Sequence, residues 1–119
     1  MLGIPTSNQF FQRIIMNIQF SYLYRDAGNF KNFGTVVFAN ANQVSLEKLN
    51  AKIKQKLIDE MYFDAFNASV PPLFFDDYDE ELDHDWHEFE CISEIEMLPN
   101  DAHGRDISLF ISSLAEKSV

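Results

Sequence analysis

The segment that follows Met16 alternates apolar and polar side chains, as a strand with one buried face does. Its apolar positions are the even-numbered ones: Ile18, Phe20, Tyr22 and Tyr24. Turn-forming residues follow at 26–29, and a second apolar run occupies 33–39. The two runs predict an antiparallel β-hairpin. Because both alternating sets of the second run carry apolar side chains, we expect this strand to lie inside the sheet.

Two later segments have the spacing of three and four residues that is typical of an amphipathic helix. In the first, Ser45 occupies an N-cap position, and the apolar set follows: Leu46, Leu49, Ile53 and Leu57. In the last, Asp106 is the N-cap candidate, and the apolar set is Ile107, Phe110, Ile111 and Leu114. The lysines of the first helix fall outside its apolar stripe. They predict a solvated basic face or, as the alternative, a docking site for an acidic partner.

The chain between these helices divides into an aromatic segment and a further strand. Residues 61–75 have no regular period and contain Pro71 and Pro72, so we expect an irregular connector that covers the core. From Trp86 onward the alternation returns. A strand here turns Phe89, Cys91 and Ile95 inward and four glutamates outward: Glu88, Glu90, Glu94 and Glu96.

These elements predict a small α+β domain in the order β-β-α-β-α, with an antiparallel hairpin, a further strand and two helices packed on one face. The 119 residues suffice for one domain with a modest core. Patterned sequence begins at Met16, a possible translation start. We therefore expect residues 1–15 to be an N-terminal extension, either disordered or upstream of the true start, unless Ser7 caps a short helix there. Residues 16–119 form the predicted domain.

Charge is distributed very unevenly along the chain. The formal net charge is −10, which argues against direct binding to a nucleic-acid backbone. Residues 1–60 hold seven Lys and Arg against four Asp and Glu, whereas residues 61–119 hold two against fifteen. Eleven of those acids lie between Asp76 and Glu96, interleaved with apolar and aromatic residues. A solvated tail would lack such residues, so we expect part of this segment to fold onto the core.

The acidic segment suggests a non-enzymatic interaction protein that docks on a basic protein partner. The expected binding surface comprises Asp76, Asp77, Asp79, Glu80, Glu81, Glu88, Glu90, Glu94 and Glu96. Such a surface would occupy the nucleic-acid-binding groove of another protein, as an inhibitor or antitoxin would, and would weaken as salt screens the charges. The simpler interpretation is that the negative charge keeps the protein soluble.

A metal site is the alternative function, as in a metal-binding protein or a small metal-dependent hydrolase. The residue types that bind divalent metals cluster in one short run: Asp83, His84, Asp85, His87 and Glu88. The order His-x-x-His-Glu matches neither HExxH nor HxxEH. Acidic neighbours disfavour a nucleophilic thiolate at Cys91, and the isolated glycines exclude a phosphate-binding loop. We therefore expect no cofactor and favour a protein that is not an enzyme.

The sequence also predicts a location and a route to self-association. A single cysteine suits a reducing cytoplasm. Residues 1–15 lack the basic and apolar regions of a signal peptide, and no run approaches 18 apolar residues, so we expect neither export by that route nor a membrane span. The aromatic hairpin offers a sheet edge through which a homodimer could form.

Two stretches, IQFSYLYRDAGNFKNFGTVVF and ELDHDWHEFE, resemble a family of short uncharacterised bacterial proteins. The most specific element is DHDWHEFE. The resemblance runs approximately from Met16 to Glu96 and implies that Met16 begins the core domain. It implies no activity and no catalytic or binding residues.

Overall fold

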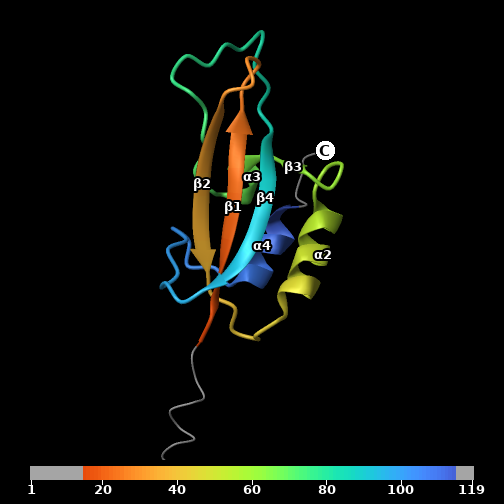
Figure 1. Ribbon diagram of the computed structural model, residues 1–119, viewed down its shortest axis with the longest axis vertical. Helices are drawn as coiled ribbons and strands as arrows, with labels where there is room; N and C mark the ends of the chain where they lie inside the picture. The colour runs from red at the N-terminus through yellow and green to blue at the C-terminus, as the bar shows by residue number, and fades with distance from the viewer. Residues whose placement is uncertain (1–14, 115–119) are drawn as a thin grey trace, which may run out of the picture.

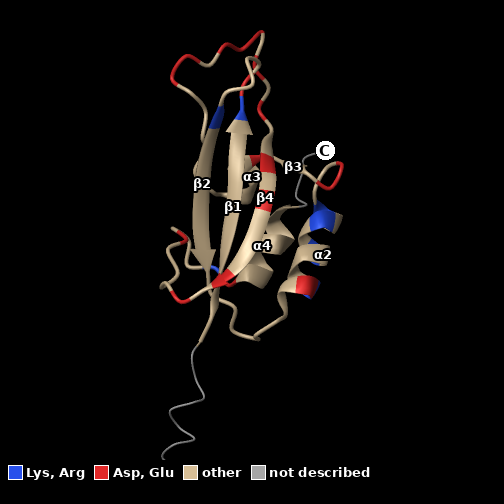
Figure 2. Ribbon diagram, viewed as in Figure 1, with Lys and Arg blue, Asp and Glu red and all other residues tan. Residues whose placement is uncertain are grey.

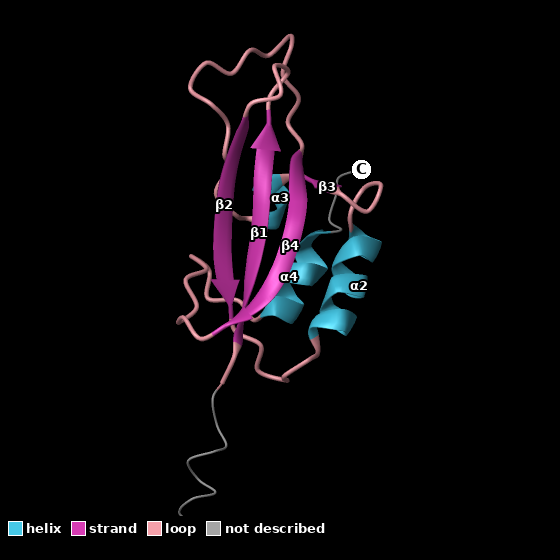
Figure 3. Cartoon of the chain, viewed as in Figure 1, coloured by secondary structure: helices cyan, strands magenta, loops and turns pink. Residues whose placement is uncertain are grey.

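The computed structural model describes residues 15–114, which form one antiparallel sheet with three helices on one of its faces (Figure 1). The strand order is β2-β1-β4-β3. The strands are β1 (Asn17–Arg25), β2 (Lys31–Phe38), β3 (Tyr62–Phe63) and β4 (His87–Ile95). The helices are α2 (Leu46–Lys56), α3 (Ala65–Ala68) and α4 (Ile107–Leu114). The predicted α+β class with an antiparallel hairpin, a further strand and helices on one face is confirmed, and Figure 3 shows the two long helices side by side.

β1 is an inner strand of the sheet and supplies three buried aromatic side chains to the core, those of Phe20, Tyr22 and Tyr24. Its even-numbered side chains, Ile18, Phe20, Tyr22 and Tyr24, are at most 1% exposed, as the alternation predicts. The ring of Phe20 lies 4.8 Å from that of Phe110 in α4, which in turn stacks on Phe38 of β2 at 4.3 Å. Each fully buried aromatic side chain contributes on the order of 1.5–3 kcal/mol to folding through the hydrophobic effect.

The prediction that the second strand lies inside the sheet is wrong, because β2 is an edge strand. Its residues Val36 and Phe38 face the core, but Phe33 is 61% exposed. Val37 is buried from the other side, where its backbone N–H and C=O groups are both hydrogen-bonded to Asn100. The second apolar set therefore reflects cover by a loop rather than by a neighbouring strand.

The two amphipathic segments form helices where their caps predict them. The Ser45 hydroxyl accepts a hydrogen bond from the Lys48 amide at the start of α2, and Leu49 and Ile53 are buried against the sheet. The Asp106 carboxylate accepts the Ser108 amide at the start of α4. Four apolar residues of α4 are buried: Ile107, Phe110, Ile111 and Leu114.

The predicted irregular connector contains two short elements, so the order is β-β-α-β-α-β-α. β3 pairs with the first residues of β4 and follows a turn in which Asp59 and Glu60 adopt positive φ. α3 begins at Asp64, whose carboxylate accepts the amides of Phe66 and Asn67. Elements of two and four residues are too short to generate a recognisable period. Most of the predicted N-terminal extension, residues 1–14, lies outside the described residues.

A buried ion pair lies in the segment that leads into α4, and its arginine also binds the end of α3. The Arg105 guanidinium donates to both carboxylate oxygens of Asp101 and also to the carbonyl oxygens of Ala68 and Ser69 at the end of α3. The side chains of Arg105 and Asp101 are 9% and 2% exposed. Although burial alone would raise the pKa of Asp101, its hydrogen bonds with Arg105 hold that pKa below the usual value. This network connects the end of α3 to α4.

Candidate interaction surface

The acidic loop, defined as residues 76–85, lies beyond one end of the sheet, close to the turn between β1 and β2 (Figure 1). It forms part of the long connection from α3 to β4. Figure 2 shows that acidic residues follow this loop, whereas the basic residues nearest to it lie at the ends of β1 and β2. Five carboxylates of the predicted binding surface are exposed here: Asp76, Asp77, Asp79, Glu80 and Glu81.

Hydrogen bonds within the loop give it a defined shape. The Asp83 carboxylate accepts the amide of Ala27 in the hairpin turn and the amide of Asp79. These two amides lower the pKa of Asp83. The Tyr78 hydroxyl donates a short hydrogen bond to Asp85, which raises the pKa of Tyr78 to about 12. The loop is therefore organised by hydrogen bonds to three of its own acids, Asp79, Asp83 and Asp85, while most of its carboxylates remain exposed to solvent.

Tyr24 attaches the loop to the sheet. Its hydroxyl donates to the carbonyl oxygen of His84 at 2.8 Å, and its ring packs against Phe74 at 4.9 Å and His84 at 5.5 Å. The side chain is 0% exposed, and burial, assisted by nearby carboxylates such as that of Asp83, raises its pKa to about 12. The phenol therefore remains a neutral hydrogen-bond donor throughout the physiological range.

His87, the first residue of β4, contacts the beginning of the same connection. It is 0% exposed and its Nε2 accepts the Leu73 amide at 2.9 Å, which requires a neutral ring with the proton on Nδ1. Rings of Tyr22, Tyr24 and Phe74 surround it. Burial lowers the pKa of His87 because the charged imidazolium loses its hydration.

A pH dependence of stability follows from this burial. The folded protein binds the His87 proton less readily than the unfolded chain, so this contribution is complete above pH ~6.5 and is lost as the pH falls through the lower pKa of the folded state. Urea unfolding between about pH 7.5 and 5.5 should show falling stability, with a slope of at most about 1.4 kcal/mol per pH unit from this group. His87→Gln, which keeps an acceptor, should flatten the profile, whereas His103→Gln should not. An unchanged profile in His87→Gln would contradict this assignment.

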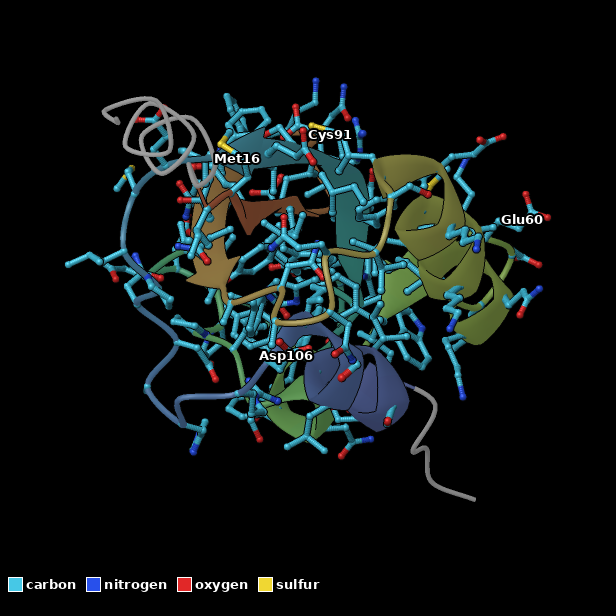
Figure 4. The ribbon with its side chains drawn as sticks, turned by 90° about the horizontal axis from the view of Figure 1, so that it is seen from below. Met16, Glu60, Cys91 and Asp106 are labelled. Atoms are coloured by element: carbon cyan, nitrogen blue, oxygen red, sulfur yellow. The ribbon has the colours of Figure 1, made fainter. Side chains whose placement is uncertain are left out.

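The predicted row of four outward glutamates on one face of β4 is wrong. Ser21 of β1 pairs with Cys91, but the next residue, Tyr22, pairs with Phe89, so Glu90 is an extra residue at a β-bulge. The bulge reverses which side chains face the core, since the pleat alternates with every residue. Cys91 is consequently exposed on the outer side of the sheet, away from the start of α4 at Asp106 (Figure 4).

The glutamates of this segment have different environments. Glu88 accepts two hydrogen bonds from the Arg25 guanidinium, at 2.8 and 3.0 Å, which hold its pKa below the usual value. Its side chain is only 10% exposed, so it is not available to a partner. Glu94 lies opposite Ile18 on the helix side of the sheet, and Glu90, Glu94 and Glu96 are all exposed. The predicted inward position holds for Phe89, which packs on the core together with Ile92, but not for Cys91; Ile95 lies opposite Asn17 on the outer side.

The candidate metal ligands are not brought together. Within residues 15–114, no group of three or more His, Cys, Asp or Glu side chains could hold a metal ion. Asp83 and Asp85 are hydrogen-bonded inside the loop, and His87 is enclosed in the core. His84 Nδ1 accepts the Trp86 amide, and Glu88 binds Arg25. Each side chain has a separate structural contact, which the clustering in sequence did not reveal.

Sequence reasoning missed the contacts that hold the loop. Tyr24 was predicted only as a core residue, and nothing in the spacing connects it with His84, which lies 60 residues away. The partner of Glu88 could have been sought among the few arginines of the chain, but the bulge at Glu90, which reverses the orientation of the residues after it, has no signature here. The surface is thus assembled from local acids and from distant aromatic anchors.

No family model, curated protein or solved structure matches this chain. The similarity to a bacterial family expected from the sequence therefore remains a prediction. Within the part of the chain that the structure describes, no helix is both long enough and apolar enough to cross a lipid bilayer.

Proposed function

We propose that this chain is a non-enzymatic interaction protein that docks its acidic loop on a basic surface of a protein partner. The observation that carries the proposal is that the loop is held in a defined shape while most of its carboxylates face solvent. A segment that served only to keep the protein soluble would not need such anchoring. Preorganisation favours binding because less conformational entropy is lost when the partner arrives.

The charge of the surrounding chain supports the same proposal. No Lys or Arg occurs between Lys56 and Arg105, a stretch that includes the whole acidic loop and β4. Arg25, close to the loop, is already paired with Glu88. The loop therefore presents a negative potential with little local compensation, which would speed encounter with a positive partner and repel a nucleic-acid backbone.

The shape and charge suit a partner that itself binds phosphate groups. Carboxylates spaced along an exposed loop can occupy the positions of phosphates in a basic groove, as an inhibitor or antitoxin would require. Leu82, at 71% exposed, adds an apolar contact among the charges. The proposed surface consists of the exposed loop acids, with Glu90, Glu94 and Glu96 as further exposed acids outside the loop. We place the protein in a reducing cytoplasm, which suits its exposed Cys91 thiol.

Affinity capture with the full chain tests the proposal. At about 0.05 M salt, basic proteins should be retained and should be released as salt approaches about 0.3 M, because screening weakens contacts between exposed charges. Added polyanion should compete. The triple variant D77N/E80Q/E81Q should lose the captured protein, whereas the control E47Q/D59N/E60Q, with the same change in net charge, should retain it.

Equal retention by both triple variants would overturn the proposal. Equal loss would do so too, since it would show that only the net charge matters. The substituted side chains are all exposed, so both variants should fold as the unmodified chain does.

A further inference from the structure

A groove of about 310 Å³ lies between α2 and α4. Three apolar residues line it, Val44, Leu49 and Ile111, together with the polar side chains of Gln55, Ser108 and Ser112. Lys52 and Lys56, one helical turn apart, lie along the α2 side. The groove is thus lined partly by apolar side chains and carries two lysines from α2.

The lysines of α2 are the main unpaired positive charge in the described part of the chain. Both ion pairs found there involve arginine, Arg25 with Glu88 and Arg105 with Asp101. The four exposed lysines of α2 take part in neither: Lys48, Lys52, Lys54 and Lys56. In a chain with nineteen acids, this helix forms a separate positive pole.

The acidic loop has the complementary character. Leu82 is 71% exposed and stands directly between Glu81 and Asp83, with Glu80 adjacent. The Asp79 carboxylate accepts the Glu81 amide, which helps to fix the backbone at this projection. An apolar side chain bordered by carboxylates complements a partly apolar groove bordered by lysines in polarity and charge.

The loop cannot reach the groove of its own molecule. It lies beyond one end of the sheet, whereas α2 and α4 pack against the opposite half (Figures 1 and 2). We propose that the acidic loop of one copy docks head-to-tail in the α2–α4 groove of a second copy, with Leu82 in the groove and Glu80 and Glu81 beside Lys52 and Lys56. The inference rests on the same loop as the proposed function and adds the surface that receives it.

Such a contact is weak and directional. Exposed ion pairs contribute little individually, and the net charge of −10 makes two copies repel each other. At about 0.15 M salt, screening limits this repulsion to charges within about 8 Å of each other. We therefore expect a dissociation constant on the order of 0.1–1 mM, as for small transient interfaces. Because the contact joins two different surfaces, it can extend to further copies rather than stop at a dimer.

Sedimentation equilibrium of the full chain at about 0.15 M salt tests the inference. The unmodified protein should show an average mass that rises with concentration. K52E/K56E reverses the charge of the groove and E80K/E81K reverses the charge of the loop. Each should weaken association by about tenfold or more. The control K31E/K54E carries the same total charge change as K52E/K56E outside this groove and should associate nearly as the unmodified chain does.

The decisive measurement is the equimolar mixture of the two reversed variants. K52E/K56E retains a normal loop and E80K/E81K retains a normal groove, and the reversed loop is also complementary in charge to the reversed groove, so the mixture should recover the association that each variant alone lacks. An unmodified chain that stays monomeric, or a mixture no heavier than its components, would overturn the inference. Normal association of K52E/K56E would also overturn it and would point instead to the open edge of β2.

This test is separable from that of the proposed function. K52E/K56E keeps every acid of the loop, so it should still capture a basic partner even though it no longer associates with itself. If the chain stayed monomeric and instead captured a different, acidic protein, the groove would bind that protein rather than a second copy, and the inference would likewise be overturned.

Discussion

Replacing Arg105 with alanine should lower the free energy of unfolding by about 3–5 kcal/mol, because removing one partner of a buried ion pair leaves the other charge uncompensated. Asp101, 2% exposed, would lose two side-chain hydrogen bonds, and the carbonyl oxygens of Ala68 and Ser69 would lose their donor. The contacts of the guanidinium with the rings of Phe38 and Phe110, at 5.6 and 5.3 Å, would be lost as well. Urea unfolding measures the change.

Two further variants show whether the ion pair itself is responsible. Lys31→Ala removes an exposed positive charge and should change stability by no more than about 0.5 kcal/mol. Asp101→Ala combined with Arg105→Ala should cost clearly less than the two single changes added together, since the second removes an interaction already lost. Additive costs would show that the two side chains act independently.

The sequence predicts the long elements well because each one buries a single face. The alternation of β1 and the stripes of α2 and α4 follow directly from contact with one core, and Ser45 and Asp106 begin their helices by satisfying free amides. It predicts β2 poorly because an apolar side chain has the same effect on the pattern whether a strand or a loop covers it. Val37 is buried by the segment around Asn100, which lies more than 60 residues away.

The candidate surface was predictable in composition but not in geometry. Acids alternating with apolar residues correctly indicated that part of this segment packs on the core, as the burial of His87 and the packing of Phe89 show. The bulge at Glu90 made the predicted orientations in the remainder of β4 wrong, because a single extra residue reverses the orientation of every residue that follows it. The five candidate metal ligands are adjacent in sequence, yet each has its own hydrogen-bond partner, as Glu88 has in Arg25.

The two charged poles of the molecule give the proposed contacts a common physical basis. The acids of the loop and the lysines of α2 lie on different elements and are not neutralised by each other within one copy. Sequence separation of the two signs was evident, but only the fold shows that they occupy distant parts of one surface. The proposed contacts follow from this distribution: we propose that the negative pole attracts a basic partner and that the positive pole binds acidic segments more weakly.

Replacing Tyr24 with alanine should destabilise the protein by about 3–5 kcal/mol, the usual cost of removing a large buried aromatic side chain. The effect should be concentrated in the acidic loop, because the ring packs on Phe74 and His84 and the hydroxyl holds the His84 carbonyl oxygen. Native-state hydrogen exchange should show loss of protection at the amide of Asp83 in the loop and at that of Trp86 directly after it. Capture of a basic partner should weaken with it.

Phe110→Ala is the matched control, since it removes a fully buried ring of similar size from the opposite half of the core. It should cost a similar free energy while leaving loop exchange and partner capture unchanged under conditions where the protein stays folded. Tyr24→Phe should cost only about 0.5–1.5 kcal/mol, because it removes a single hydrogen bond, and Tyr24→Leu provides an intermediate if the alanine variant does not fold. If Phe110→Ala loosens the loop as much as Tyr24→Ala does, the loop depends on global stability and Tyr24 is not its anchor.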